Sequence, residues 1–175
     1  MNHTDHVNLI RGGVGGRGGR WADLGSGEGA FTLALAELVG PEAHIVAVDK
    51  DRRALRGLEG RPALRALDAP VETRVADFTR PLDLRDLDGV IMANSLHYVR
   101  DKQPVLASVR RMLKPTGRLI IVEYGTDRGN TWVPYPFTYA RWEKLAEEAG
   151  FSNTRLLSTV PSRWLGTIYS AVTES

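Results

Sequence analysis

Short apolar runs alternate with helix-forming stretches along most of the chain. Apolar or alternating runs of five or six residues predict strands, and these runs lie at 20–24, 44–48, 71–76, 89–93 and 118–122. Between them, helix-forming or amphipathic stretches predict helices at 31–39, 52–67, 103–113 and 139–149. The stretch 52–67 forms one helix or two short ones, since Pro62 suits the first turn of a second helix.

The order of these elements predicts the fold class. Two further strands, at 154–159 and 167–172, are joined through Pro161, Ser162 and Arg163, which is typical of a hairpin. Strand–helix–strand units that end in a hairpin predict an α/β fold. We expect a Rossmann-like sheet of seven strands, mostly parallel with a reversed last strand, and helices on both faces. Because no linker divides the chain, we expect residues 1–175 to form a single domain with its core at 20–175.

The composition is that of a globular chain with a buried core, at 42% hydrophobic and 25% charged residues. No apolar run approaches the roughly 20 residues of a membrane span, and the first residues lack a secretory signal pattern. The chain has no cysteine, which excludes disulfides, thiolate metal ligands and a cysteine nucleophile. We therefore expect a cytoplasmic protein without a membrane span.

Charge gives little support to a nucleic-acid partner. The net charge is only +2, and basic residues cluster at 52–65 and 110–114 while acids are interleaved elsewhere. Nucleic-acid binding favours one coherent basic face, whereas basic clusters on amphipathic helices are usually solvated surface. We therefore expect no nucleic-acid partner.

A glycine-rich segment, DLGSGEG at 23–29, follows the first predicted strand. Parallel α/β sheets bind ligands at such turns, and glycine lets a ligand approach the backbone. The spacing G-x-G-x-x-A formally satisfies a dinucleotide pattern, with Asp49 suitably placed to hold a ribose. However, Asp23 and Glu28 would put negative charge beside a pyrophosphate. The two acids therefore favour a cationic cofactor.

The pattern D-x-G-x-G-x-G resembles motif I of class I S-adenosylmethionine-dependent methyltransferases, and later segments match this family in order. Asp49, in HIVAVDKD, resembles the acid that holds the ribose hydroxyls. Asp77, in VADF, resembles the acid that binds the adenine amino group. The segment DGVIMANSLH at 88–97 resembles the fourth-strand motif. LKPTGRL at 113–119 is similar to L-K-P-G-G-x-L, with Thr116 replacing a glycine.

This resemblance covers residues 20–172 and implies a cofactor together with the residues that hold it. Members bind S-adenosyl-L-methionine and release S-adenosyl-L-homocysteine, and we expect no metal. The segment NSLHY is similar to the small-molecule "type 11" and quinone-biosynthesis-like group. The implied cofactor-binding residues are Asp23, Gly25, Ser26, Gly27, Asp49, Lys50, Asp77, Phe78, Asn94 and Ser95.

The implied reaction is an in-line displacement that moves the sulfonium methyl group to a small-molecule acceptor. The protein supplies orientation, and a general base is needed only if the acceptor must lose a proton. Cytosine C5 methylation normally uses a cysteine, which is absent, and adenine-amine methylation usually has Asn/Asp-Pro-Pro-Tyr where this chain reads Asn-Ser-Leu-His. Asn94 and Glu123 are too few oxygen ligands to argue for a metal-dependent catechol-type enzyme.

His97 and Tyr98 are the candidate catalytic residues, because they follow the fourth strand where an acceptor would approach. An imidazole suits proton transfer near neutral pH. The alternative is that His97 packs beneath the cofactor or caps a turn. The long connection 125–139 carries aromatic residues that either wall the acceptor or cover the sheet edge, and Glu123 just before it is a further candidate for the acceptor pocket.

Three other functions stay open at this point. They are an RNA methyltransferase acting on rRNA or tRNA, a member that binds the cofactor without catalysis, and a NAD-binding oxidoreductase. The oligomeric state is open between monomer and homodimer.

A second glycine run, at 12–19, precedes every predicted strand and so lacks the setting of a ligand loop. Its two Arg-Gly-Gly units are too few for an RNA-binding tail. We expect this run to be a flexible hinge that lets the amphipathic segment 5–10 act as a lid over the cofactor. Residues 1–19 would then form a lid segment and its hinge.

Overall fold

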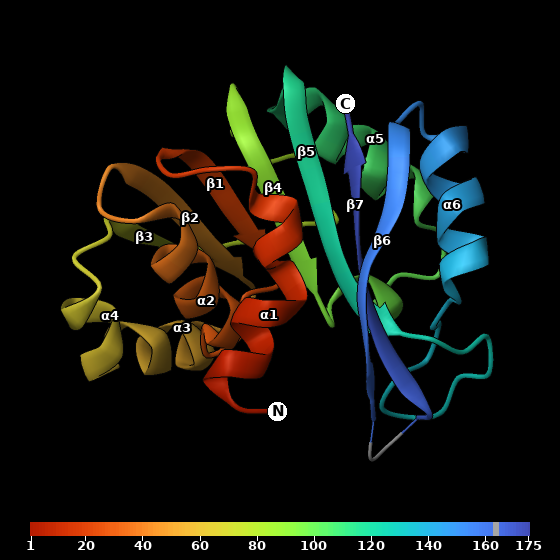
Figure 1. Cartoon of the computed structure of the whole chain (residues 1–175), viewed down its shortest axis with the longest axis horizontal. Coiled ribbons are helices and arrows are strands. Elements are labelled where there is room, and N and C mark those ends of the chain that lie inside the picture. Colours follow the sequence, from red (N-terminus) through yellow and green to blue (C-terminus); the bar gives the residue numbers. More distant parts are fainter. Residues whose placement is uncertain (163–164) are drawn as a thin grey trace.

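The computed structural model describes residues 1–162 and 165–175, and its centre is a seven-stranded sheet (Figure 1). The strands are β1 (Gly19–Leu24), β2 (Ala43–Asp49), β3 (Val71–Val75), β4 (Leu87–Ala93), β5 (Leu113–Tyr124), β6 (Ser152–Pro161) and β7 (Thr167–Glu174). Their order is β3-β2-β1-β4-β5-β7-β6, with β1 to β5 parallel and β7 antiparallel to both neighbours. The predicted mostly parallel sheet with a reversed last strand is confirmed.

Helices cover both faces of the sheet, as predicted. They are α1 (His3–Val14), α2 (Ala30–Val39), α3 (Arg52–Glu59), α4 (Pro62–Ala66), α5 (Gln103–Met112) and α6 (Tyr139–Glu148), with a 3-10 turn η1 (Leu96–Tyr98). One hydrophobic cluster joins α1 and α2 to one face, and a second joins α5 and α6 to the other (Figure 1). None of the described helices is long and apolar enough to cross a membrane.

Local sequence explains the main boundaries. The run from Leu119 to Val122 in β5 is apolar at every position because both faces of this inner strand are buried. The stretch 52–67 forms two helices, and Pro62 opens the second at a position that needs no amide hydrogen. Arg163, the last residue of the predicted hairpin connection, lies outside the described residues.

The hinge predicted at 12–19 is wrong at Gly12 and Gly13, because both lie within α1. A Cβ on Gly13 would lie 2.9 Å from the side chains of Ile120 and Leu157, so glycine here allows the helix to approach the sheet closely. Arg155 donates to the carbonyl of Gly12 over 2.9 Å. This end of α1 is packed, and the lid role of residues 1–19 stays a prediction.

The topology determines at which edge of the sheet the parallel strands end. The carboxyl ends of the parallel strands lie along the lower edge in Figure 1, opposite the C-terminus, and the amino end of α1 lies at the same edge. In open α/β sheets, ligands bind in the crevice outside these strand ends.

Candidate functional site

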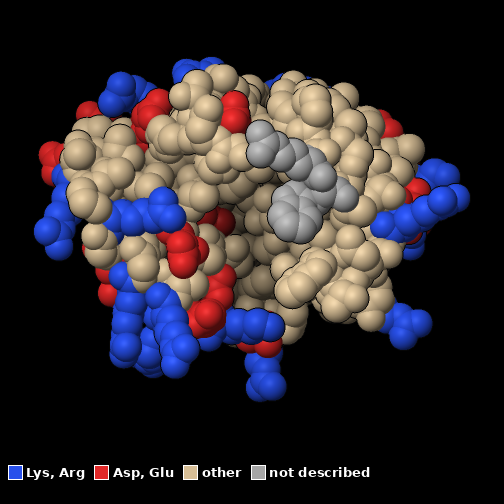
Figure 2. Space-filling view, turned by 90° about the horizontal axis from the view of Figure 1, so that it is seen from below, with Lys and Arg blue, Asp and Glu red and all other residues tan. Residues whose placement is uncertain are grey.

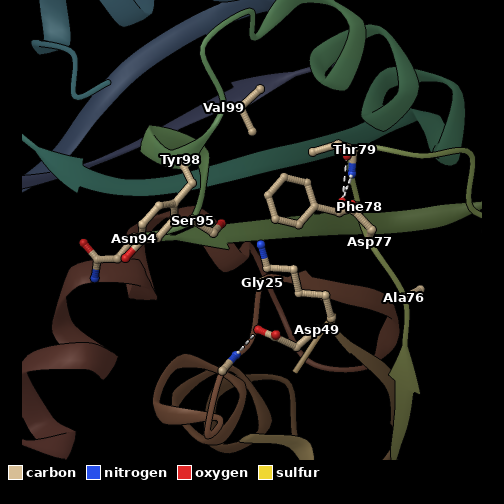
Figure 3. Close-up of a pocket in the computed structure, with 12 residues that line it drawn as sticks. Gly25, Asp49, Ala76, Asp77, Phe78, Thr79, Asn94, Ser95, Tyr98 and Val99 are labelled. Carbon is tan, nitrogen blue, oxygen red and sulfur yellow. Dashed lines mark hydrogen bonds between the residues drawn. The ribbon is translucent and has the colours of Figure 1, made fainter. Parts of the chain in front are cut away.

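A cavity of about 360 Å³ lies at the carboxyl ends of β1 to β4 (Figure 3). Its wall contains every predicted cofactor-binding residue except Asp23 and Ser26. The full lining is Gly25, Gly27, Asp49, Lys50, Ala76, Asp77, Phe78, Thr79, Asn94, Ser95, Tyr98 and Val99. Motifs that are far apart in the sequence therefore meet in one cavity.

The glycine loop forms a cradle that a larger residue would block. The amide N–H of Gly25 donates to the carbonyl of Val48 over 2.8 Å and fixes the loop against β2. Gly25 has a φ of +81°, and a Cβ there would lie 2.5 Å from the Cβ of Ser95. Gly27 has a φ of +53° and faces open space. The loop therefore leaves room for a ligand against its backbone.

Two carboxylates in the wall are fixed by backbone donors. Asp49 accepts from the amide of Gly27 over 2.8 Å, drawn in Figure 3, and from that of Asp51 over 2.8 Å. Asp77 accepts from the hydroxyl and amide of Thr79, and these two hydrogen bonds hold its pKa below the usual range. Both carboxylates are thus held in one orientation at the cavity.

Asp23 lies behind the loop instead of in the cavity wall. One carboxylate oxygen accepts from the Thr32 hydroxyl over 2.6 Å, and the other has no partner among the described residues. Burial, with a smaller contribution from Asp49, raises the pKa of Asp23 to about 7. A buried oxygen without a donor is the group that a nearby cation would stabilise. Together with the open cradle, it fits a cofactor that carries a sulfonium and an ammonium group.

A second cavity, of about 440 Å³, shares Asn94 and Tyr98 with the first. Its lining is Asn94, His97, Tyr98, Tyr124, Asn130, Trp132, Val133 and Leu165. Trp132 comes from the long connection after β5, so part of this loop walls the cavity. Phe137 of the same loop is instead fully buried in the core. The amide of Tyr135 donates to the carbonyl of His97 over 3.0 Å and ties the loop to η1.

His97 forms a buried pair with Glu123. The Nδ1 atom of His97 lies 2.7 Å from Oε2 of Glu123, while Oε1 accepts from the amides of Leu96 and His97. The His97 side chain is 2% exposed, and that of Glu123 is fully buried. The sequence offers Glu123 as a residue near the acceptor and as a possible oxygen ligand, but not as the partner of His97. An acid directly after an apolar strand was the only signal for Glu123, and its pairing with His97 depends on β4 and β5 being neighbours.

Charged side chains are distributed unevenly around the cavities. Figure 2, which views the strand-end edge from below, shows a hollow with acidic and basic side chains on one side and largely uncharged residues on the other. Among the described residues, no group of three or more His, Cys, Asp or Glu side chains is placed to hold a metal ion. The hollow thus has one side rich in charged residues, where Asp49, Lys50 and Asp77 lie, and one side with aromatic residues.

Known sequences match the same part of the chain. The family model of a methyltransferase domain matches residues 16–159. The ubiquinone/menaquinone biosynthesis C-methyltransferase UbiE of Pasteurella multocida is 33% identical over 111 residues, which are 62% of this chain and 41% of that protein. The UbiE protein of Azotobacter vinelandii is 29% identical over 128 residues, which are 70% of this chain and 51% of that protein. The chain thus spans about half the length, or less, of these relatives.

Solved structures share the fold. A SAM-dependent methyltransferase from Aquifex aeolicus superposes with a TM-score of 0.69 at 18% identity, covering 99% of this chain and 98% of that one. A putative O-methyltransferase from Nostoc punctiforme superposes with a TM-score of 0.76 at 19% identity, covering 98% of this chain and 56% of that one. With the family model matched over most of the chain, the protein belongs to the methyltransferase domain family.

Proposed function

We propose that this chain transfers the methyl group of S-adenosyl-L-methionine to a small-molecule acceptor. The observation that carries the proposal is the pair of adjoining cavities, because Asn94 and Tyr98 line both. One cavity has the acids and open glycine loop suited to a cationic nucleoside cofactor. The other has an aromatic wall suited to an organic acceptor. Their shared wall is where an in-line displacement could occur.

In this proposal the chain's residues bind and orient, while the cofactor supplies an activated methyl group when bound. Asp49 and Asp77 accept hydrogen bonds from the ribose and adenine, as the family resemblance implies. Asp23 offsets the positive charge of the ligand from behind the loop. His97 and Tyr98 contact the acceptor from η1.

The alternatives have weaker support. The matched relatives are named as C-methyltransferases of quinone biosynthesis, which favours a small organic acceptor over RNA. Asp23 lies fully buried behind the glycine loop and would oppose a pyrophosphate, which disfavours a NAD-binding oxidoreductase.

Ligand binding tests the cofactor assignment. S-adenosyl-L-homocysteine should raise the melting temperature of the protein, and NAD should not, because a ligand stabilises a fold only by binding its native state. Asp49→Asn should weaken S-adenosyl-L-homocysteine binding by roughly tenfold or more, since charge-assisted hydrogen bonds contribute about 1.5–3 kcal/mol. Calorimetric titration measures this affinity. Stabilisation by NAD and not by S-adenosyl-L-homocysteine would contradict the proposal.

Turnover tests the reaction itself. Transfer of an isotope-labelled methyl group from S-adenosyl-L-methionine should occur to at least one member of a panel of phenols, enols, amines and thiols. Binding of the cofactor with no transfer to any member would favour the non-catalytic alternative.

A further inference from the structure

Lys102 is a buried lysine directly before α5, at a position that is unfavourable for a cation. The residue is only 6% exposed, and burial of an ammonium group costs free energy unless hydrogen bonds compensate for it. It also occupies the N-cap of α5, where the helix dipole disfavours positive charge and where a short polar side chain would satisfy the free amides. Neither the core nor the helix therefore accounts for a lysine here.

The contacts of the Lys102 ammonium group join two segments that are far apart in the sequence. The group donates to the carbonyl of Val99 over 2.8 Å and to the carbonyl of Tyr135 over 3.0 Å. It also lies 4.9 Å from the centre of the Phe137 ring, a distance at which a cation and an aromatic face attract each other. Val99 directly follows η1, whereas Tyr135 and Phe137 belong to the connection 125–139, here called the acceptor loop.

The two segments joined by Lys102 also form the wall of the second cavity. Tyr98 of η1 lines this cavity together with Trp132 and Val133 of the acceptor loop. Figure 3 shows Tyr98 and Val99 on the same stretch of chain beside the cofactor cavity. The separation between η1 and the acceptor loop therefore sets the width of the second cavity.

The acceptor loop has few other attachments around Tyr135. The amide of Tyr135 donates to a carbonyl of η1 over 3.0 Å, and the Tyr169 hydroxyl donates to the carbonyl of Phe137 over 3.2 Å. Asn130 accepts from two amides of the same loop, which shapes its tip without attaching it to η1. Lys102 supplies the charged hydrogen bond, and such bonds are stronger than those between neutral groups.

The η1 side of this contact is fixed independently of Lys102. The amides of Leu96 and His97 donate to the buried carboxylate of Glu123 over 2.9 and 3.1 Å. The residues that line the cofactor cavity include none from the acceptor loop, every residue of which the structure describes. Loss of the ammonium group should therefore release the acceptor loop and leave η1 and the cofactor cavity in place.

We propose that Lys102 is a positioning residue that determines acceptor specificity, because it holds the acceptor loop against η1 and so fixes the width of the acceptor cavity. Lys102 lines neither cavity, and it acts through Tyr98, Trp132 and Val133. This inference rests on the proposed methyl transfer, since it assigns the second cavity to the acceptor.

The variant that tests the proposal is Lys102→Met. Methionine keeps an unbranched apolar chain that can pack on Phe137, and it removes the donors to the two carbonyls. The matched control is Lys144→Met, the same change at an exposed position of α6. If Lys102→Met does not fold, Lys102→Gln takes its place, because its amide can still donate to one carbonyl, and its effects should be smaller in the same direction.

Hydrogen exchange followed by NMR reads the position of the loop without any acceptor. In Lys102→Met the amide of Tyr135 should exchange about ten- to a hundredfold faster, the factor that a hydrogen bond to a charged group contributes. The amides of Leu96 and His97 should keep their wild-type rates, because Glu123 still holds them. A general loss of stability would instead speed exchange at all three amides.

Methyl-transfer kinetics read the effect on specificity. With the acceptor that the panel identifies, Lys102→Met should raise the acceptor KM about tenfold or more, while the affinity for S-adenosyl-L-homocysteine changes less than about twofold. The preference for this acceptor over a bulkier analogue, measured as a ratio of kcat/KM values, should fall by about tenfold. A variant that is only partly folded would lower kcat and leave both properties unchanged. Lys144→Met should match wild type throughout.

Three results would overturn the inference. They are an unchanged exchange rate at Tyr135, an unchanged acceptor KM, and a loss of S-adenosyl-L-homocysteine affinity that parallels the rise in acceptor KM. In the first two cases the cofactor still binds and the methyl transfer stands. Failure of wild type to bind S-adenosyl-L-homocysteine would refute the proposed function instead, and the exchange rates would still decide whether Lys102 holds the loop.

Discussion

Replacement of Asp23 by asparagine should stabilise the ligand-free protein at neutral and alkaline pH. Burial raises the pKa of Asp23 from 3.8 to about 7, so the folded state holds this proton more tightly than the unfolded state. Below pH 4 both states are protonated, and the group has no effect on stability. Between pH 4 and 7 the unfolded state ionises first, so stability falls as the pH rises.

The magnitude follows from the size of the shift. About three pKa units, at about 1.4 kcal/mol each, correspond to about 4 kcal/mol of destabilisation above pH 7. Because the side chain is fully buried, solvent screens little of this effect. Asparagine keeps an oxygen for the Thr32 hydroxyl and removes the charge. The buried amide hydrogens of asparagine cost about 1–3 kcal/mol at every pH. They therefore lower the unfolding free energy of the variant by the same amount throughout and do not change how the difference between variant and wild type depends on pH.

Urea denaturation of wild type and Asp23→Asn between pH 4.5 and 8.5 measures the effect. The difference in unfolding free energy should grow in favour of the variant by about 3 kcal/mol across this range, because the unfolded state is already largely ionised at pH 4.5. Asp83→Asn, at a carboxyl that is 85% exposed, is the matched control, and its unfolding free energy should differ from that of wild type by the same amount at every pH. If the difference for Asp23→Asn were also independent of pH, the account of this buried carboxyl would be refuted.

Three other measurements test the cofactor side of the site. Binding of S-adenosyl-L-homocysteine, whose ammonium group favours ionised Asp23, should tighten as the pH rises through 7, and Asp23→Asn should lose this dependence in calorimetric titrations. Gly25→Ala should lower the melting temperature and abolish this binding, because residue 25 has a φ of +81° and an added Cβ would clash with Ser95. Gly16→Ala, where an added Cβ would meet open space, should change neither the melting temperature nor the binding. If residues 1–19 act as a lid, the cofactor product should slow hydrogen exchange at residues 3–7, and equal exchange with and without it would refute the lid.

Much of the fold could be predicted because the signals are local. Inner parallel strands are buried on both faces, so runs such as 118–122 are apolar throughout and stand out from the helices. The failure at Gly12 and Gly13 has a clear cause. Glycine favours flexible segments by intrinsic propensity, but close packing against Ile120 and Leu157 favours it inside this helix. A single sequence does not reveal that tertiary contact.

The grouping of the proposed cofactor-binding residues in one cavity was predictable for a related reason. The glycine loop is a continuous segment, and Asp49 and Asp77 each directly follow a predicted strand, so residues after the strand ends meet at one edge. The pairing of His97 with Glu123 is harder to predict, because it depends on which strands are neighbours. In the structure β4 and β5 pair with Ala93 beside Val122, which brings the residues that follow each strand together.

Two buried acids of this edge should respond to mutation with opposite sign. Asp23 has one oxygen without a donor, so its charge is a cost in the absence of a ligand. Glu123 accepts from three N–H groups, so Glu123→Ala would leave two amides and a ring nitrogen without acceptors, at about 1–3 kcal/mol each. In the same urea experiment at pH 8, Asp23→Asn should raise the unfolding free energy and Glu123→Ala should lower it. Equal signs would refute the account in which Asp23 lacks a donor while Glu123 is stabilised by three.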